Sequence, residues 1–303
     1  MKKIKSTKKT IQIGVIGGSG VYEIDGIKNL KEIKIKTPFG NPSDAIITGT
    51  LEGTDVAFLP RHGRGHTLLP SELNSRANIW ALKSLGVEQI ISISACGSLK
   101  EELPPRHFVI PDQLFDRTKS RPGSTFYGEG IVGHTSFANP YCKGLTDRVF
   151  QAGQTLKLPM HQGGTFIIIE GPNFSTKAES RVWRSQGFSI IGMTNLPEAR
   201  LAREAEICYI TVGLVTDYDV WKEGEEVSTE KVTETIHANV ANVKALIKAA
   251  LPNLHRQRQC ECATAAQYAV FTNPKHMNKK TFKKLELIIG KYFTTESRVK
   301  TTS

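Results

Sequence analysis

Two aspartates, Asp217 and Asp219, come directly after an apolar run that is long enough for one buried strand. The run, residues 207–215, has the Val-, Ile- and Thr-rich composition of a strand buried on both faces of a parallel sheet. Ionised carboxylates cost several kcal/mol in an apolar site, so these two either reach solvent in an Asp-rich turn or meet a ligand. In open α/β sheets, ligands bind at the carboxyl ends of the strands. The pair is therefore a candidate ligand-binding site, with a solvated turn as the alternative.

Other expected strand ends carry groups that bind oxyanions. The glycine-rich turn 17–20 fits neither the dinucleotide fingerprint nor the P-loop, but its backbone N–H groups and a serine can approach an anion closely. An arginine guanidinium matches two phosphate oxygens at once. Each feature alone is explained by a turn serine, a surface arginine or a helix cap. Together they predict a pocket for one small oxyanion such as inorganic phosphate, formed by Ser19, Arg61, His62, Ser94, Ala95 and Thr194.

The elements that must position these residues alternate along the chain. Apolar runs predict strands at residues 11–16, 56–59, 89–93, 165–169, 189–192 and 207–215. Apolar residues at helical spacing predict a helix over residues 71–85 and a long helix capped by Ser228. Pro197, with acidic residues close behind it, favours a further helix start. Strands alternating with helices predict a single α/β domain with a largely parallel sheet.

Composition and charge limit the class of protein. The chain has 303 residues, 39% hydrophobic, and its apolar runs are far shorter than the ~20 residues of a membrane span. The net charge of +11 is concentrated in the tails: residues 1–9 carry five Lys and no acid, and residues 256–303 carry ten basic against three acidic residues. Nucleic-acid binders usually present a basic stripe on a folded face. Tails that keep the protein in solution are the preferred interpretation, and nucleic-acid binding through these lysines is the alternative.

Five cysteines, an odd number spread along the chain, indicate a reducing compartment rather than a disulfide framework. Cys260 and Cys262 are one residue apart, so they are either a redox-labile pair or ordinary tail thiols. Two thiolates alone are too few for a structural zinc site. Cys96, beside the expected phosphate loop, is interpreted as a packing residue rather than a nucleophile.

Eight motifs in one order carry a resemblance that covers about residues 11–250: GVIGGSG, TPFGNPSDAI, LPRHGRGH, NIWALKSLGV, SACGSL, IEGPNFSTKAES, GMTNLPEA and VTDYDVW. With them the chain resembles the trimeric purine nucleoside phosphorylase family, and within it the S-methyl-5'-thioadenosine phosphorylases. The resemblance implies one domain with a central mixed, largely parallel sheet flanked by helices, as in the purine and uridine phosphorylases. It also implies a pentosyltransferase that converts methylthioadenosine and phosphate to adenine and 5-methylthioribose 1-phosphate, in purine and methionine salvage.

The resemblance assigns roles to individual residues. Phosphate is expected on the six residues named above, the ribose on Met193 and the face of the base on Phe174. The purine is expected on Asp217 and Asp219, which are also the catalytic residues. His66 and His134 are expected on the side of the 5′-substituent, with His134 contributed by a neighbouring subunit. Ser175 and Thr229 match positions linked with substrate choice.

The choice of base follows from hydrogen bonding. Adenine presents an acceptor at N7 and a donor at N6, and a carboxyl group can pair with both when it is protonated. Asp217 therefore favours a 6-aminopurine, with its pKa raised by burial and by Asp219. Asn195, where the human-type enzyme has Thr, leaves open a 6-oxopurine nucleoside phosphorylase acting on inosine, guanosine or methylthioinosine. A hydrolase that uses water is a further alternative.

The expected organisation is a basic N-terminal extension over residues 1–10, a phosphorylase domain over 11–274 and a basic C-terminal extension over 275–303, with a possible short helix. The family implies a cytoplasmic homotrimer or dimer of trimers. Neither a cofactor nor a metal is implied, because phosphate is a co-substrate. The expected partners are methylthioadenosine and phosphate, with no nucleic acid and no membrane.

Overall fold

The computed structural model describes residues 11–18, 20, 24–225, 227–254 and 258–293. Ser19, one of the expected phosphate ligands, lies outside the described residues. The lysine-rich N-terminus and the end of the C-terminal tail lie outside them too, so the nucleic-acid alternative concerns mainly residues that the structure does not describe.

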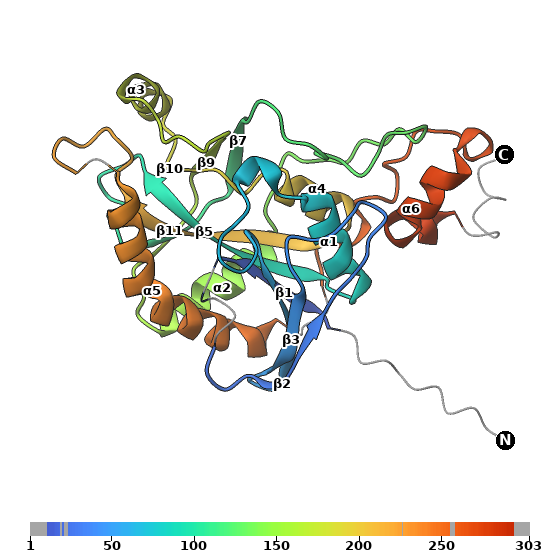
Figure 1. Ribbon diagram of the computed structural model, residues 1–303, viewed down its shortest axis with the longest axis horizontal. Coiled ribbons are helices and arrows are strands. Elements are labelled where there is room, and N and C mark those ends of the chain that lie inside the picture. The colour runs from blue at the N-terminus through green and yellow to red at the C-terminus, as the bar shows by residue number, and fades with distance from the viewer. Residues whose placement is uncertain (1–10, 19, 21–23, 226, 255–257, 294–303) are drawn as a thin grey trace.

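A mixed sheet of eleven strands is the centre of the described part of the chain (Figure 1). The strands run in the order β2-β3-β4-β1-β5-β10-β9-β7. In addition, β11 pairs with β5 and β6, and β6 pairs with β8. Six of the strand pairs are parallel and four antiparallel, so the expected mixed, largely parallel sheet is confirmed. The strands are β1 (Ile13–Gly17), β2 (Lys28–Ile33), β3 (Ile46–Leu51), β4 (Thr54–Pro60), β5 (Gln89–Ser98), β6 (Phe108–Ile110), β7 (Gln113–Arg117), β8 (Met160–Gln162), β9 (Thr165–Ile169), β10 (Ile190–Gly192) and β11 (Cys208–Asp217).

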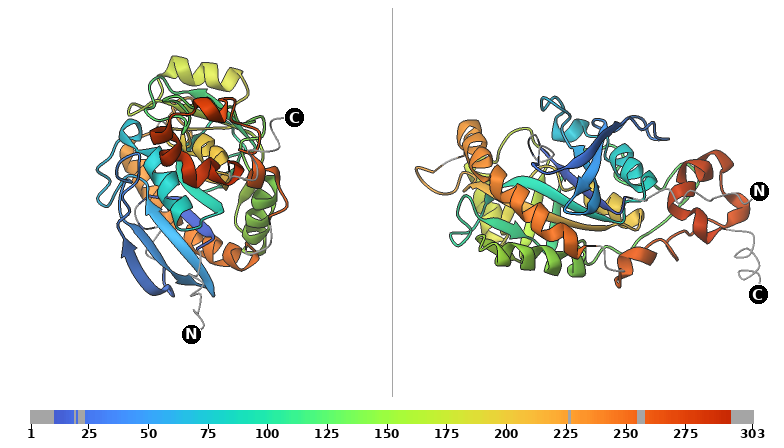
Figure 2. Two further views of the ribbon diagram at one scale, coloured as in Figure 1. Left: turned by 90° about the vertical axis from the view of Figure 1, so that its right-hand side faces the viewer. Right: turned by 90° about the horizontal axis from the view of Figure 1, so that it is seen from below.

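Helices cover both faces of the sheet (Figure 2). On one face, α2 and α5 pack on alternate residues of the central strands, such as Ile91 and Ile210. On the other face, α1 and α4 pack on the residues between them, such as Ile90 and Tyr209. The helices are α1 (Ser75–Ser84), α2 (Lys143–Thr155), α3 (Lys177–Ser185), α4 (Glu198–Glu204), α5 (Thr229–Ala250) and α6 (Lys279–Ile289).

Strand β11 is buried at every one of its ten residues and pairs in parallel with β5 over almost its whole length. The strand predicted at residues 207–215 is therefore confirmed, and it extends to Asp217. Its partner β5 is longer than the sequence predicted, because pairing with β11 continues to Gly97 and β10 joins at Gly97 and Ser98. Ser94 and Ala95 consequently lie inside a strand, and the expectation that they follow one was wrong.

Capping residues set the ends of two predicted helices. The helix predicted over residues 71–85 begins only at Ser75, because Asn74 caps it by accepting a hydrogen bond from the Ala77 N–H. The preceding residues Pro70–Glu72 form a separate 3-10 turn. The long helix α5 begins as predicted, with the Ser228 side chain accepting from the Lys231 N–H.

The described C-terminal residues pack on the domain. The short helix expected there occurs as α6, and its Leu285 and Ile288 join the core on the α1 face. Within the described residues, none of the helices has the length and apolar character that crossing a membrane requires.

Candidate active site

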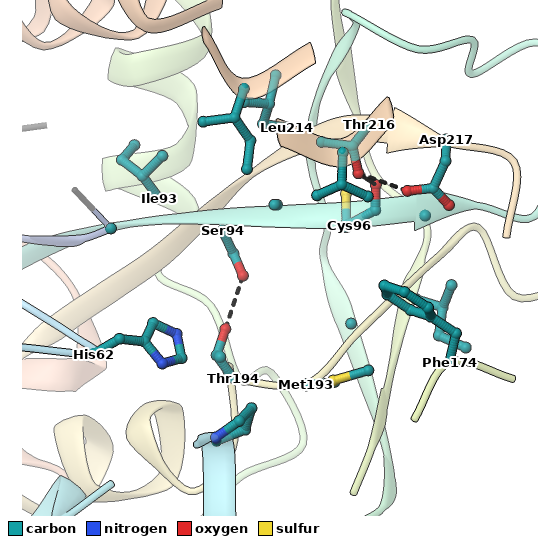
Figure 3. A pocket seen from close by; sticks show the side chains of 18 of the residues that line it. His62, Ile93, Ser94, Cys96, Phe174, Met193, Thr194, Leu214, Thr216 and Asp217 are labelled. Atoms are coloured by element: carbon teal, nitrogen blue, oxygen red, sulfur yellow. Dashed lines mark hydrogen bonds between the residues drawn. The ribbon is translucent and has the colours of Figure 1, made fainter. Parts of the chain in front are cut away.

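A cavity of about 430 Å³ opens where β5, β10 and β11 end, beside the segments that follow β4 and β9. Its size is that of a small-molecule site. Figure 3 shows His62 at one end, Ser94 and Thr194 between, and Asp217 with Phe174 at the other end. Ser94 comes from β5 and Asp217 from its parallel neighbour β11, and the carboxyl ends of these two strands lie at the same edge of the sheet.

Most residues predicted for the site line this one cavity: Arg61, His62, His66, Ser94, Ala95, Phe174, Ser175, Met193, Thr194, Asp217 and Asp219. Gly18 also lines it, next to Ser19 in the sequence. Two predicted residues do not. Thr229 is exposed at the first turn of α5. His134 lies on the surface, where its ring meets the exposed Phe271 edge-on.

Asp217, the last residue of β11, is buried with both carboxyl oxygens engaged. Oδ2 accepts from the Thr216 hydroxyl at 2.6 Å and Oδ1 from the Asp219 backbone N–H at 2.8 Å. Burial raises the pKa of Asp217 against the effect of these hydrogen bonds. The Asp219 backbone N–H lowers the pKa of Asp217, whereas repulsion between the two carboxylates, which are one residue apart, acts in the opposite direction. Burial therefore favours the neutral form of Asp217.

Asp219 is 4% exposed, and its Oδ2 has no hydrogen-bond partner within the described part of the chain. Burial, and then the neighbouring Asp217, raise its pKa to about 6, although the nearby Ser180 and Ser175 act in the opposite direction. Its backbone has a positive φ of 52°, which is uncommon outside glycine. A buried acceptor without a donor is expensive, so this oxygen is suited to an N–H group of a ligand.

Hydroxyl groups and a neutral histidine form the opposite end of the cavity. The Ser94 and Thr194 hydroxyls are 2.8 Å apart. His62 Nδ1 lies 2.8 Å from the Leu68 carbonyl oxygen, which can only accept, so Nδ1 carries the proton and Nε2 is an acceptor. Burial, and then the charge of Arg61, lower the pKa of His62 to about 4. His66 stacks on this ring with centroids 4.3 Å apart.

Arg61 is buried and most of its donors are already used. Its Nε and Nη2 form a fork on Glu198 at 3.1 and 3.2 Å, Nη2 also donates to Ser92, and Nη1 donates to the Ile93 carbonyl. Burial alone would lower the pKa of Arg61, but Glu198 more than offsets this and the pKa is raised. The two-point contact with an anion that the sequence suggested does not fit, because four of the five guanidinium hydrogens are engaged. One Nη1 hydrogen remains.

Glu198 was not predicted as part of the site. It is 2% exposed, and besides Arg61 it accepts from the Ser92 and Tyr209 hydroxyls at 2.9 and 2.6 Å. The sequence showed only an acid behind Pro197 in the first turn of a helix. Its partners are Arg61, directly after β4, and residues of β5 and β11, so only the fold reveals that Glu198 fixes the arginine.

Arg121 was also missed, and it fastens three segments of the cavity wall. Its guanidinium donates to the backbone carbonyls of Pro70, Ile169 and Met193, all of which belong to lining residues. It also pairs with Glu170 at 3.3 Å. No sequence motif marks it, because its partners are backbone oxygens remote in the chain.

One wall of the cavity is apolar and comes from α5. The sequence predicted core positions on this helix, but four of its apolar side chains also face the cavity: Val232, Ile236, Val240 and Val243. Asn195, by contrast, is fully buried away from the lining and hydrogen bonds to Tyr141 and Thr211. It makes no part of the wall, so it gives no support to a 6-oxopurine preference.

The comparisons with known proteins agree with this geometry. The model of the phosphorylase superfamily matches residues 12–252. The S-methyl-5'-thioadenosine phosphorylase of Geobacter sulfurreducens is 51% identical over 281 residues, which is 92% of this chain and 98% of the relative. That of Nitrosopumilus maritimus is 48% identical over 264 residues, 87% of this chain and all of the relative.

Solved structures give the same family. A methylthioadenosine phosphorylase from an Antarctic soil metagenomic library is 44% identical with a TM-score of 0.88, covering 93% of this chain and 99% of that one. A variant of the adenosine/methylthioadenosine phosphorylase of Schistosoma mansoni, in complex with methylthioadenosine, is 34% identical with a TM-score of 0.76, covering 85% and 96%. By sequence and fold, the chain belongs to the phosphorylase superfamily and, within it, to the S-methyl-5'-thioadenosine phosphorylases.

Proposed function

We propose that the protein catalyses the reversible phosphorolysis of S-methyl-5'-thioadenosine to adenine and 5-methylthioribose 1-phosphate. The observation that carries this proposal is the division of one cavity into two chemically different ends. Hydroxyls and a histidine acceptor lie at one end, and two buried aspartates with raised pKa values lie at the other.

Phosphate occupies the hydroxyl end in this proposal. The Ser94 and Thr194 hydroxyls donate to its oxygens, together with the remaining Nη1 hydrogen of Arg61 and groups of the glycine turn that includes Ser19. Neutral His62 presents Nε2 as an acceptor, which suits the hydroxyl of monohydrogen phosphate. The Arg61–Glu198 pair keeps the positive charge in place when no anion is bound.

Adenine occupies the aspartate end. The unpartnered Oδ2 of Asp219 accepts from the N6 amino group, and protonated Asp217 donates to N7. Phe174, 44% exposed and lining the cavity, covers the face of the base, and Met193 contacts the ribose. Ser175 lines the same end and contributes to substrate choice.

The apolar wall of α5 favours a methylthio group as the 5′-substituent of the nucleoside. Val232 and Ile236 offer no hydrogen bond to a 5′-hydroxyl, whereas a methylthio group buries apolar surface against them, worth about 25 cal/mol per Å². His66 completes this side, and His134 of a second subunit is expected there too.

The chemistry follows from the two ends. Lengthening of the bond between N9 and C1′ builds positive charge on the ribose, and a phosphate oxygen attacks C1′ from the face opposite the base, inverting it. The electron pair of the broken bond passes to the purine, which takes the proton of Asp217 at N7. The residues present need no metal or cofactor for this reaction, because phosphate itself is the nucleophile.

The proposal also covers the assembly of subunits and the cellular location of the protein. Val132, His134 and Phe271 lie where residues 132–134 pair with 269–271, and with Tyr268, just before the second segment, they are called the 132/271 patch. Three of them are exposed apolar side chains, at 52%, 86% and 72%. We assign this patch to the contact between subunits of a homotrimer, with the dimer of trimers as a further possibility. None of the five cysteines forms a disulfide, which fits the cytoplasm, where the enzyme serves purine and methionine salvage.

Turnover of methylthioadenosine, measured with and without phosphate, tests the proposal. The expected products are adenine and a sugar 1-phosphate, formed only when phosphate is present, with inosine a poorer substrate by kcat/KM. Release of free sugar without phosphate would identify a hydrolase, and a higher kcat/KM for inosine would identify a 6-oxopurine nucleoside phosphorylase.

A further inference from the structure

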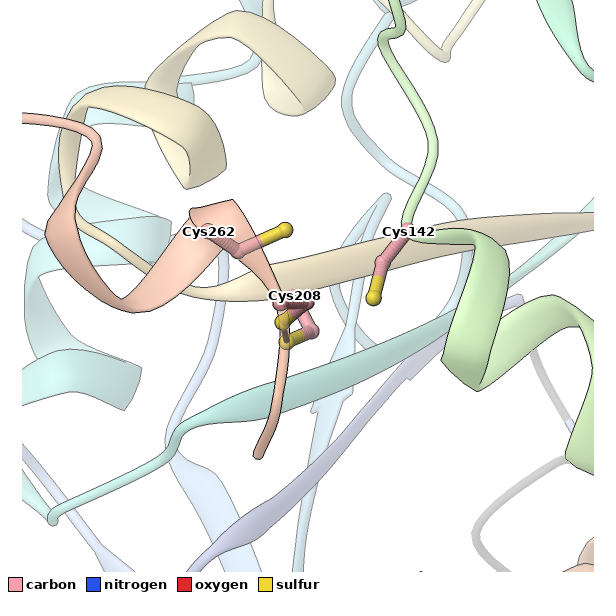
Figure 4. Close-up of side chains that lie close together, drawn as sticks. Cys142, Cys208 and Cys262 are labelled. Atoms are coloured by element: carbon pink, nitrogen blue, oxygen red, sulfur yellow. Dashed lines mark hydrogen bonds between the residues drawn. The ribbon is translucent and has the colours of Figure 1, made fainter. Parts of the chain in front are cut away.

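Four of the five cysteines meet at the end of β11 that lies away from the cavity (Figure 4). Cys208 is the first residue of β11 and Cys142 is the residue before α2. Cys260 and Cys262 belong to the C-terminal segment. The four sulfur atoms all lie within 4.8 Å of one another, so the isolated pair in the sequence becomes a set of four in the fold.

The spacing of the sulfurs is close to that of a tetrahedral thiolate site. Zinc–sulfur bonds of about 2.3 Å place ligand sulfurs about 3.8 Å apart. The Cys208 and Cys260 sulfurs are 3.3 Å apart, and all four sulfurs lie within 4.8 Å of one another. A tetrahedron with edges of about 3.8 Å falls inside this range, so small side-chain shifts would complete it. All four residues are free thiols.

The surroundings suit a group of negative charge. Three of the four cysteines are buried, and Cys142 stands at the positive end of the 13-residue helix α2. The Arg258 guanidinium pairs with Glu88 at 3.2 Å and donates to the Glu206 carbonyl at 2.8 Å, and its positive charge lies close enough to Cys208 and Cys260 to interact with them. A positive charge beside the sulfurs favours the thiolate form, which is the form that binds a metal.

We propose that Cys142, Cys208, Cys260 and Cys262 bind one Zn²⁺ ion as a structural site. Binding forms four zinc–sulfur bonds and releases the four thiol protons to solvent, with no change in oxidation state. All four positions are filled by protein ligands, so no position is open for catalysis. The site joins the start of β11 and of α2 to the C-terminal segment that carries Tyr268, Phe271 and α6.

Metal content is the direct test. Protein purified under reducing conditions without added metal or chelator is expected to contain one zinc per chain by plasma mass spectrometry. The double variant Cys260→Ser/Cys262→Ser is expected to lose almost all of it and to have a lower Tm. Cys96→Ser, the matched control at the fifth cysteine, is expected to keep one zinc.

A second measurement does not depend on how a variant folds. Titration of the unaltered protein with a mercurial reagent is expected to release one zinc per chain, read with a chromogenic chelator. Protein with Co²⁺ in place of zinc is expected to show the absorption bands of tetrahedral cobalt–thiolate coordination. Zinc-free protein that takes up no Co²⁺, or peptide mapping that finds disulfides among these cysteines in freshly isolated protein, would overturn the proposal.

Discussion

Asp217 and Asp219 are one residue apart and similarly buried, yet their hydrogen bonding differs. Both oxygens of Asp217 accept bonds from neighbours, whereas Oδ2 of Asp219 has none among the described residues. Asp219 is therefore the stronger acceptor for a ligand N–H group. The Thr216 hydroxyl also lies 3.2 Å from the Cys96 carbonyl, so it can donate there when Asp217 is protonated.

Replacing Asp217 by Asn tests the pairing with the purine. Asn offers N7 a donor permanently and can present the same donor to O6 of a 6-oxopurine. We expect Asp217→Asn to shift the ratio of kcat/KM for methylthioadenosine against methylthioinosine by about tenfold or more toward the 6-oxopurine. Steady-state kinetics with both nucleosides measure the shift, and an unchanged ratio would refute the assignment of Asp217 to the base.

Replacing Asp219 by Asn should stabilise the protein at neutral pH. Because its pKa is raised to about 6, folded Asp219 holds a proton between about pH 4 and 6 that the unfolded chain has released. The protonated Asp219 carboxyl therefore stabilises the folded protein fully below about pH 4. This stabilisation, up to about 3 kcal/mol, is lost as the pH rises through 6. Asn also tolerates the positive φ.

Calorimetry at two pH values tests the predicted pH dependence of the stability. We expect Asp219→Asn to raise Tm more at pH 7.5 than at pH 4.5, while kcat/KM falls because the acceptor for N6 is weakened. An equal change in Tm at both pH values would show that the carboxyl pKa is not the cause.

Gly97 allows the close approach of β5 to the aspartates. A Cβ atom there would lie 2.9 Å from Asp217 Oδ1 and 3.0 Å from the Ile191 side chain. We expect Gly97→Ala to displace the carboxyl group and lower kcat/KM about a hundredfold. Gly144→Ala is the matched control, because its added methyl meets only Arg148 at 3.9 Å. Equal kinetics for both variants would contradict the steric argument.

At the scale of elements, Arg121 joins the segments around Pro70, Ile169 and Met193 into one wall. We expect Arg121→Ala to raise KM for methylthioadenosine more than it lowers kcat. Without the guanidinium the three wall segments are no longer held together, so binding of the substrate weakens, whereas the side chains that take part in the reaction are unchanged. Arg200→Ala is the control, since that arginine pairs with Asp116 at 2.8 Å and is 39% exposed. A fall in kcat alone, with KM unchanged, would argue against this positioning role.

The sequence predicted the elements whose pattern is local and strong. Strand β9 and the capped start of α5 match the predictions because a short apolar run and a capping serine can each be recognised within one stretch of sequence. The capping box at Thr176 and Glu179 was also readable, although α3 was not predicted. Strand β2 could not be predicted, because it is an exposed edge strand of Lys and Glu.

The site was predictable where residue type implies chemistry, and not where geometry decides. Ser94, Thr194 and the two aspartates converge as expected. The orientation of Arg61 toward Glu198 depends on a contact 137 residues away. The four-cysteine cluster likewise depends on three distant segments, so the sequence offered only its Cys260–Cys262 half.

At the scale of the whole molecule, the 132/271 patch predicts how copies of the chain associate. We expect Phe271→Glu to lower the mass found by analytical ultracentrifugation from that of a trimer to that of a monomer, because a charge would replace a ring that the proposed contact between subunits covers. Leu30→Glu is the control: Leu30 is 57% exposed on β2, outside the patch. A chain that is already monomeric, or a Phe271→Glu variant that stays trimeric, would contradict the assignment.

Strand β11 begins at Cys208 and ends at Asp217, and every residue between them is buried. Its backbone amides are therefore among those that exchange with deuterated solvent only when the whole protein opens. A purine held at one tip and a cation held at the other would both slow that opening, so each raises the protection of the entire strand. Exchange along β11 thus reports the occupancy of either tip from the middle of the molecule.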